Sequence, residues 1–319
     1  MMLTSHITQK YASASLVDYL SKRFTYLSQE EWRERIVEQQ VIVNQKPAHP
    51  DTGLVIGDIV SYHFPDLKEP DADINYSIVY EDEWLFAVNK PGNLLVHKAG
   101  RSITKNLAFL LRHASGNPAY ASAHAVSRLD RETSGLVLFS KDMECLKKLH
   151  RDFAAKTVTK EYLAVVHNAP KEKKCTVDLA IGQDSASAVT YKFRVDQKNG
   201  KEAMTHVETL SVCESHALVR AMPVTGRTHQ VRIHLSAIGC PVVGDKLYGM
   251  AESDYLAWRN DPEGHASLLE FPRQALHCRR LGIVHPVTKQ EMNLEAPVPE
   301  DMKGLIDKLN LKVGGIEFL

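Results

Sequence analysis

The chain has 319 residues, 44% of them hydrophobic and 24% charged, which is ordinary for a globular protein of one large domain or of one large and one small domain. No apolar run approaches the roughly 18 residues of a membrane span, and the N-terminal sequence MMLTSHITQKYASAS lacks the apolar core of a signal peptide. Lys+Arg and Asp+Glu are both 39, so the composition is not that of a strongly basic nucleic-acid-binding domain, although a neutral chain can concentrate positive charge on one face.

The 5 cysteines are odd in number, scattered, and never arranged as C-x-x-C. This pattern excludes the usual zinc spacings and predicts reduced thiols in a cytoplasmic protein. The histidines near the C-terminal end, in the segments 273–277 and 285–286, are interpreted as core or edge groups because no three ligands come together in the sequence. We therefore expect no metal site.

The first block, about residues 11–65, predicts a small unit of helix, helix, strand, turn and strand. Ser28 followed by two glutamates is typical of a helix start, and 41–44 (VIVN) alternates like a strand. The segment 54–60 (LVIGDIV) predicts a strand interrupted by a Gly-Asp turn. This order, with VIVNQK and GDIV, resembles the small RNA-binding domain of ribosomal protein S-four. Four glutamates make its helices less basic than in RNA-binding members, so an appendage that packs on its neighbour or binds protein remains the alternative.

Residues 64–73 (FPDLKEPDAD) are rich in proline and acids and predict a linker. The expected domains are therefore 1–63, a linker at 64–75, and 76–319. Within the larger domain, 77–89 predicts two strands around an acidic turn, and the stretch from Val207 to Ala221 predicts a meander, which favours an antiparallel or mixed sheet. Residues 250–270 predict a loop with at most one helical turn, and the chain is expected to end in a helix at 301–309.

Asp130 lies in a polar segment, 127–135 (SRLDRETSG), that leads into a short buried strand at 136–139. Arg128 and Arg131 flank it, and a guanidinium within about 4–6 Å lowers a carboxyl pKa by roughly 1–3 units. An aspartate kept ionised in this way suits a nucleophile or an electrostatic stabiliser. The alternative from these residues alone is a surface ion-pair cluster.

A second polar cluster lies in 223–235 (PVTGRTHQVRIHL), where Thr228 is expected to cap a helix. His229, Gln230 and Arg232 would then emerge from its first turns, where the positive end of the helix attracts anions. The structural alternative is an amphipathic helix with a solvated basic face.

A third segment, 160–166 (KEYLAVV), alternates as a strand with Tyr162 on one face. A tyrosine on a half-buried strand usually belongs to the core.

Five segments occur in order within residues 76–300: RLDRETSG, KEYLAVV, KEAMT, PVTGRTHQVRIHL and GCPVVGDKLYG. Together they resemble the RluA-type RNA pseudouridine synthases. The resemblance implies an α+β fold with a mixed, mostly antiparallel sheet, a small N-terminal α/β RNA-binding domain, and isomerisation of uridine without a cofactor. Ser127 stands where most of the family has histidine, and Asn93 stands where an earlier Lys-Pro motif has glycine.

By this resemblance Asp130 is the essential residue, as a nucleophile at the anomeric carbon or as a base in a glycal route. Tyr162 would stack on the flipped uracil or deprotonate it, and Arg232 would keep Asp130 ionised. Arg128 would fill the gap left by the flipped nucleotide or steady the loop, and Arg227 would fix the loop or hold phosphate. The expected substrate-binding residues are Arg128, Arg227, Thr133, His229 and Gln230.

The expected partner is RNA with a looped or single-stranded target, because the nucleotide must leave its stack. The appended domain favours large-subunit ribosomal RNA over transfer RNA by analogy alone. Two other classes remain: a non-catalytic RNA-binding or ribosome-assembly factor, and a hydrolase that uses Asp130 with His124 or His229. The oligomeric state is open.

Overall fold

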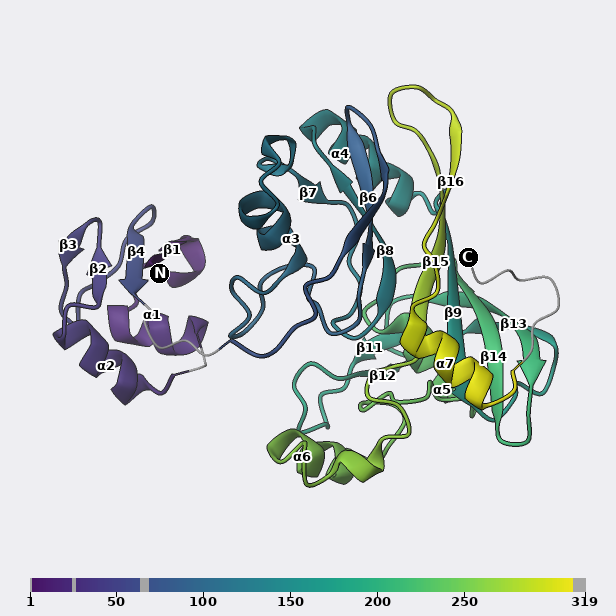
Figure 1. The fold of residues 1–319 in the computed structure, drawn as a ribbon. Coiled ribbons are helices and arrows are strands. Elements are labelled where there is room, and N and C mark those ends of the chain that lie inside the picture. The colour runs from purple at the N-terminus through teal and green to yellow at the C-terminus, as the bar shows by residue number, and fades with distance from the viewer. Residues whose placement is uncertain (1, 25–26, 64–68, 312–319) are drawn as a thin grey trace. The chain divides into compact units, whose positions relative to one another are not determined.

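The computed structural model describes residues 2–24, 27–63 and 69–311 (Figure 1). The chain divides into two compact units, Met1–Pro70 with Lys98–Thr104, and Asp71–His97 with Lys105–Leu319. The segment 98–104 belongs to the first unit because the Glu69 carboxylate accepts hydrogen bonds from the amides of Ile103 (2.9 Å) and Thr104 (3.0 Å). Of the predicted linker, residues 64–68 lie outside the described part of the chain. No helix in the described ranges is long and apolar enough to span a lipid bilayer.

The first unit packs two helices on a four-stranded sheet of order β1-β4-β2-β3. Its elements are β1 (Met2–His6), α1 (Leu16–Arg23), α2 (Gln29–Val37), β2 (Val41–Val43), β3 (Lys46–Pro47) and β4 (Ile59–His63). As predicted, α2 begins at Ser28, whose hydroxyl accepts from the Glu31 amide at 3.2 Å while the Glu31 carboxylate accepts from the Ser28 amide at 2.7 Å. The core of the unit includes the fully buried Trp32 and Leu20.

Two details of this unit differ from the sequence prediction. The strand expected from Leu54 begins only at Ile59, because the Leu54 amide donates to the Ala14 carbonyl (3.0 Å) and the Val55 amide to the Asp58 carboxylate (2.8 Å). These bonds make a turn of the segment instead of a ladder. Strand β1 gave no signal in the sequence; it forms through its antiparallel pairing with β4.

The second unit is built on a ten-stranded sheet of order β10-β13-β14-β9-β15-β8-β6-β5, with β16 paired to β15 and β7 to β8. Its strands are β5 (Ser77–Glu81), β6 (Leu85–Lys90), β7 (His124–Ala125), β8 (Ser134–Ser140), β9 (Thr159–His167), β10 (Lys174–Asp178), β13 (Met204–Val212), β14 (His216–Pro223), β15 (Leu276–Val284) and β16 (Glu291–Glu295). Among the described pairs in this sheet, only β15 and β8 run parallel. The expected mixed, mostly antiparallel sheet is confirmed. A small ribbon of β11 (Ile181–Gln183) and β12 (Phe193–Val195) lies outside it.

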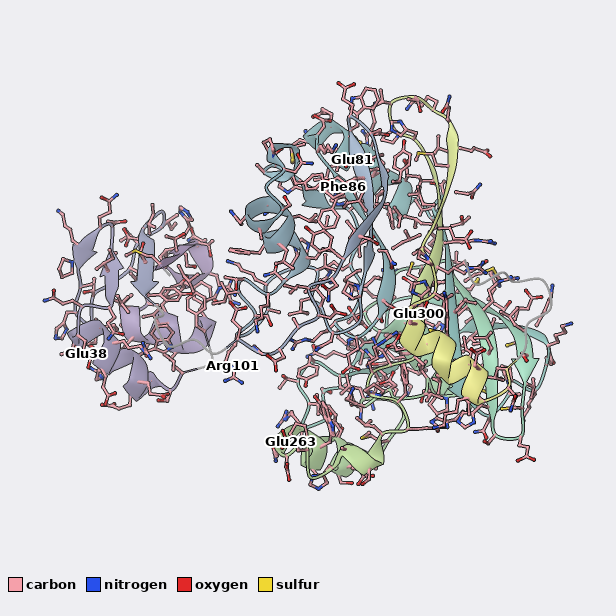
Figure 2. The ribbon with its side chains drawn as sticks, viewed as in Figure 1. Glu38, Glu81, Phe86, Arg101, Glu263 and Glu300 are labelled. Atoms are coloured by element: carbon pink, nitrogen blue, oxygen red, sulfur yellow. The ribbon has the colours of Figure 1, made fainter. Side chains whose placement is uncertain are left out.

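Alternating side chains of β6 and β8 supply two separate cores. Leu85 and Leu138 face α4 (Met143–Ala154), whereas Phe86 and Phe139 face α3 (Leu107–Phe109) and the turns that follow it. Phe86 is labelled in Figure 2. Its ring packs against two others, with centroid distances of 4.4 Å to Tyr120 and 5.2 Å to Phe139. Because both faces of these strands are covered, β8 is rigid and holds the loop before it in place.

The other half of the sheet is covered by α5 (Gln230–Ala237) and α7 (Glu300–Lys308), whose apolar residues join the core of β9, β13 and β14 (Figure 1). The final helix agrees with the prediction for 301–309. The prediction of a loop at 250–270 is wrong in part, because α6 (Glu252–Asn260) forms there. Its Glu252 accepts from the Ser187 hydroxyl (2.6 Å) and from Lys192 (2.9 Å), tertiary contacts that a single-segment pattern does not contain.

Candidate active site

The loop that carries Asp130 joins β7 to β8 and is held through its backbone. The Arg131 carbonyl accepts from the Leu94 amide at 3.0 Å and from the ammonium of Lys90 at 3.2 Å. Lys90 also donates to the carbonyls of Pro91 and Leu94, both at 2.8 Å, and is fully buried. Burial and the nearby positive charge of Arg273 lower the pKa of Lys90 to about 7.

Asp130 and Asp245 share one guanidinium. Arg232, in the first turn of α5, donates Nε and Nη2 to the two oxygens of Asp245 at 2.6 and 2.8 Å. Its remaining nitrogen, Nη1, donates to Oδ2 of Asp130 at 2.8 Å. The Arg232 and Asp245 side chains are 7% and 0% exposed, whereas that of Asp130 is 30% exposed and so open to a ligand. The predicted pairing of Arg232 with Asp130 is thus present in the structure, and Asp245 is an additional partner.

This arrangement decides which carboxylate oxygen is open. Nε and Nη2 of Arg232 bond to Asp245, and Asp130 receives a single hydrogen bond, from Nη1, in place of a two-bond fork. Oδ1 of Asp130 faces Nε2 of His229 at 4.0 Å, beyond hydrogen-bond distance, and no described residue donates a hydrogen bond to it. One oxygen is therefore fixed and the other is open to a substrate atom.

The charges around Asp130 keep it ionised. Burial opposes the charged form, but the positive charges of Arg232 and the His229 ring, with the Arg232 hydrogen bond, outweigh it and hold the pKa of Asp130 below its ordinary value. The two carboxylates likewise overcome burial and raise the pKa of Arg232. A permanently charged arginine beside an ionised aspartate is suited to nucleophilic or basic chemistry by the carboxylate.

Helix α5 starts one residue later than expected. Its N-cap is His229, in the left-handed conformation at φ 56°, and Thr228 makes no capping bond. The turn directs the His229 ring toward Asp130 and lets Nδ1 hydrogen-bond to the Tyr248 hydroxyl at 2.8 Å. Burial lowers the pKa of His229, and the Asp130 carboxylate opposes that shift.

Two of the expected substrate-binding residues are buried and use their side chains inside the protein. Gln230 accepts from the Thr225 hydroxyl (2.7 Å) and the Arg227 amide (3.0 Å) through its carbonyl oxygen. The Thr133 hydroxyl, in a side chain 2% exposed, accepts from the Gln274 amide nitrogen at 2.6 Å. These contacts hold the polar segments 127–135 and 223–235 in place from inside the protein.

Tyr162 of β9 lies directly opposite Cys278 of β15 in the sheet. Burial, the Cys278 thiol and the Asp130 carboxylate raise the pKa of Tyr162 well above its ordinary value. Burial likewise raises the pKa of Cys278 to about 12, so both groups stay protonated at neutral pH. On the other side of Cys278, Gly135 has φ 109°, and a Cβ there would overlap the Cys278 backbone. Glycine is therefore required where the loop enters β8.

The loop has further supports that the sequence reasoning missed. Glu132 accepts from the Lys246 ammonium (2.6 Å) and the Gln274 amide (3.2 Å), and its carbonyl accepts from Arg273 (3.2 Å). Arg273 in turn makes two bonds to Asp301 of α7, at 2.6 and 2.8 Å. The sequence pointed to these supports only through the resemblance of segments 239–249 and 273–277 to the family. That resemblance does not show which residues the segments contact.

The two outer arginines differ in their surroundings. Arg128 is exposed, and the structure gives it no hydrogen bond or ion pair with any described residue. Arg227 donates through Nε to the Glu202 carbonyl at 2.9 Å and lines a pocket of about 450 Å³ with Lys201 and the β11–β12 ribbon. Arg128 thus lies in the Asp130 segment and is exposed, whereas Arg227 lies beside the His229 turn and is partly exposed.

The fold and this site define a class of RNA-modifying enzyme. The family model described as RNA pseudouridylate synthase matches residues 85–237, a span that contains Asp130, Tyr162 and Arg232. A solved human structure, RNA Pseudouridylate Synthase Domain Containing 4, is similar with a TM-score of 0.57 and 25% identity, covering 75% of this chain and 95% of that one.

Curated relatives extend the likeness over most of the chain. An uncharacterized RNA pseudouridine synthase of Bacillus subtilis is 33% identical over 90% of this chain and 93% of its own length. The ribosomal large subunit pseudouridine synthase D of Pseudomonas aeruginosa is 37% identical over 74% of this chain and 72% of its own length. The chain belongs to the RluA-type family of RNA pseudouridine synthases, isomerases that convert uridine to pseudouridine.

Proposed function

We propose that this enzyme isomerises specific uridines of large-subunit ribosomal RNA in the cytoplasm, with Asp130 as the reacting carboxylate. The observation that carries the proposal is the geometry of Asp130, whose side chain is 30% exposed and whose Oδ2 is bonded to Arg232 at 2.8 Å while Oδ1 accepts no hydrogen bond from a described residue. The choice of RNA rests on relatives named ribosomal large subunit pseudouridine synthase D, among them one from Neisseria meningitidis that is 33% identical over 94% of this chain.

In the proposed reaction the uracil detaches from C1′ of the ribose, rotates and rejoins through carbon 5. Asp130 attacks C1′ as a nucleophile or removes a ribose proton in a glycal route; both need the ionised carboxylate that Arg232 maintains. Tyr162 is partly buried on β9, and its ring stacks on the flipped base or its hydroxyl handles the carbon 5 proton. The chemistry calls on no cofactor.

Recognition is assigned to the exposed cations. Arg128, which has no partner among the described residues, occupies the space left by the flipped nucleotide or steadies the loop around it. Arg227, beside the pocket near His229, contacts phosphate. We assign Thr133 and Gln230 a positioning role instead, because their side chains are buried and bonded within the protein.

The unit at residues 1–63 is proposed to be an RNA-binding domain like that of ribosomal protein S-four, joined by a linker at 64–75 to the synthase domain at 76–319. Its order of helices and short strands supports this, and Lys22 and Arg23 at the end of α1 are exposed. Replacing both with glutamate should weaken RNA affinity and make that affinity less dependent on salt concentration, since phosphate contacts act by charge. Unchanged affinity and salt dependence would contradict this assignment.

The decisive test maps pseudouridines at single-nucleotide resolution in total RNA from cells with the gene intact, deleted, or carrying Asp130→Asn. We expect the same large-subunit ribosomal sites to disappear in the deletion and in the variant. Asp307→Asn, at an exposed carboxylate of α7, is the matched control and should keep every site. Sites lost only from transfer RNA would overturn the target, and sites that survive Asp130→Asn would overturn the mechanism.

A further inference from the structure

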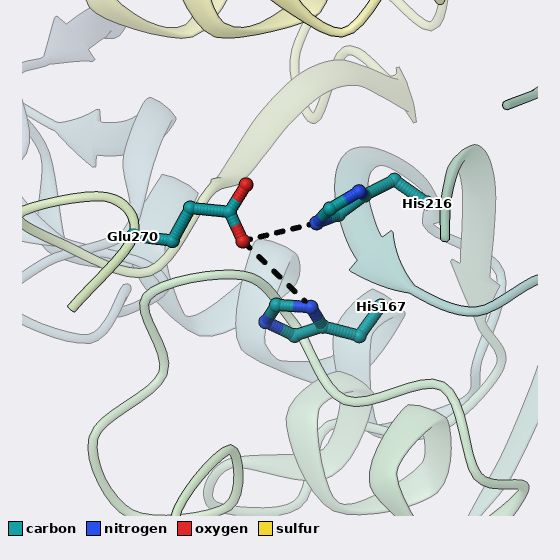
Figure 3. Close-up of side chains that lie close together, drawn as sticks. All are labelled: His167, His216 and Glu270. Atoms are coloured by element: carbon teal, nitrogen blue, oxygen red, sulfur yellow. Dashed lines mark hydrogen bonds and ion pairs between the residues drawn. The ribbon is translucent and has the colours of Figure 1, made fainter. Parts of the chain in front are cut away.

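His167, at the end of β9, and His216, at the start of β14, lie close to the carboxylate of Glu270 (Figure 3). Nε2 of His216 lies 3.0 Å from Oε2 of Glu270, and Nδ1 of His167 lies 3.9 Å from the same oxygen. One ligand atom from each residue falls within 4.8 Å of the other two. The sequence hid this cluster because its members are about fifty residues apart from one another.

The backbone that carries the two histidines is rigid. His167 ends β9 and His216 begins β14, and the two are directly paired in the antiparallel ladder, so their side chains leave the same face. The pairing of the two chain segments continues past these histidines, where the Asn168 amide donates to the Ser215 carbonyl at 2.7 Å, and the His167 amide donates to the Pro241 carbonyl at 2.9 Å. A pair of imidazoles held at fixed spacing is the main requirement of a preorganised metal site.

The donor atoms have the spacing and chemistry of a zinc-type site. Ligands about 2.0–2.1 Å from a tetrahedral ion are roughly 3.3 Å from one another. The two distances to Glu270 are 3.0 and 3.9 Å and all three atoms lie within 4.8 Å, so an ion would draw the partly exposed His167 and Glu270 side chains slightly inward. Ser215 Oγ lies 2.9 Å from Nδ1 of His216, so its hydroxyl can accept from Nδ1–H and leave Nε2 free to coordinate.

We propose that His167, His216 and Glu270 bind a divalent transition-metal ion of the zinc type, with water completing its coordination. Two imidazoles and one carboxylate are a donor set that zinc and related ions prefer. The side chains of His167 and Glu270 are 35% and 34% exposed, so an ion enters from solvent, while that of His216 is 9% exposed and anchors the site.

The ion acts on the structure of the enzyme and not on the uridine. Five residues of strand at about 3.3 Å each separate His167 from Tyr162 by roughly 16 Å, and the odd spacing puts them on opposite faces. Glu270, however, directly precedes the segment 271–274, which braces Glu132 and Thr133 of the Asp130 loop. A metal at Glu270 fixes the start of that segment to the sheet.

The test titrates the full-length, chelator-treated protein with Zn²⁺ by calorimetry and with Co²⁺ by visible absorption, which reports the coordination geometry. We expect one ion per chain, saturable binding in the micromolar range, and a melting temperature that rises with ion concentration by mass action. His167→Gln and Glu270→Gln, both at partly exposed positions, should each weaken binding at least about tenfold, as the loss of even an outer-shell partner does.

The matched control is His265→Gln. His265 lies 3.9 Å from the carboxylate of Asp261 in the same connection but has no third ligand among the described residues, so its loss should leave the Zn²⁺ affinity unchanged. Equal binding by the wild type, His167→Gln and Glu270→Gln, or no saturation below the millimolar range, would show that the three residues form only an ion pair. Pseudouridine formation is measured separately, so this result and that of the proposed function are independent.

Discussion

Replacing Arg232 with lysine is the sharpest test of how the site holds Asp130. The guanidinium makes three charge-assisted hydrogen bonds, two to Asp245 and one to Asp130, at 2.6–2.8 Å. A lysine ammonium is a single point on a flexible stem, and from this position it can serve one carboxylate but not both. Arg232→Lys keeps the charge and removes the bridge.

The expected magnitude follows from the bonds lost. Two charge-assisted hydrogen bonds at about 1.5–3 kcal/mol each give about 3–6 kcal/mol, and breaking one side of a buried ion pair costs about 3–5 kcal/mol. We therefore expect the free energy of unfolding to fall by roughly 4 kcal/mol. If Asp130 is displaced by about 1 Å, the reaction rate should fall about 10²-fold, which corresponds to about 2.7 kcal/mol of activation free energy.

The variant should also change the pH dependence. The folded pKa of Asp130 lies below the unfolded value of about 3.9, so its contribution to stability is present above that value and is lost as pH falls through the folded pKa. With Arg232→Lys the folded pKa rises toward the unfolded value, so the acid limb of the single-turnover rate moves to higher pH. Urea unfolding and single-turnover pseudouridine formation on a ribosomal RNA fragment measure both effects.

The control is Arg280→Lys on β15, where an exposed guanidinium meets Glu295 at 3.0 Å. An exposed pair contributes about 0–1 kcal/mol, so this variant should stay close to the wild type in stability and rate. If Arg232→Lys unfolds at the same urea concentration as the wild type and keeps its rate within threefold, the bridge does not position Asp130 and the reasoning fails.

Three further variants test the supports of the loop. Gly135→Ala should lower the free energy of unfolding by at least ~2 kcal/mol, because its φ of 109° and the Cys278 backbone leave no room for a Cβ; a normal melting curve would contradict this. Thr133→Val should cost about 1–3 kcal/mol by leaving the Gln274 amide without its acceptor, yet leave RNA affinity unchanged in a binding titration, and a weakened affinity would restore its predicted substrate role. Lys90→Met should cost about 3 kcal/mol or more, since three buried carbonyls lose their donor. The pKa of Lys90 is about 7 in the folded protein and about 10.4 in the unfolded chain, so between these pH values the unfolded chain binds more protons. The stability of the wild type therefore rises with pH in this range, and urea titrations should show that Lys90→Met abolishes the rise.

Helices and strands were predictable where the residues that stabilise them lie within the same short segment. The helix start at Ser28, the strand that ends at Lys90 and the apolar strand after Gly135 all follow from spacing and residue type. Strand β1 and helix α6 were missed because their stabilising partners lie elsewhere in the chain. The start of α5 was misplaced by one residue, since threonine is a good cap in general and the left-handed His229 is held by Tyr248, nineteen residues on.

The site shows the same division. Asp130, Tyr162 and Arg232 were named from motifs, and the structure brings Arg232 to Asp130 and Tyr162 to its neighbourhood. Asp245 was not named, although its carboxylate sets the orientation of Arg232. A pairing between positions thirteen residues apart across a turn depends on tertiary geometry, which no spacing rule in the sequence encodes.

The single hydrogen bond from Arg232 explains why Asp130 stays reactive beside its partner. A guanidinium free to make a two-bond fork would occupy both oxygens of Asp130 and leave a stable, unreactive ion pair. In the structure Asp130 receives only the Nη1 bond of Arg232, at 2.8 Å, so the positive charge favours ionisation while Oδ1 accepts no hydrogen bond from a described residue.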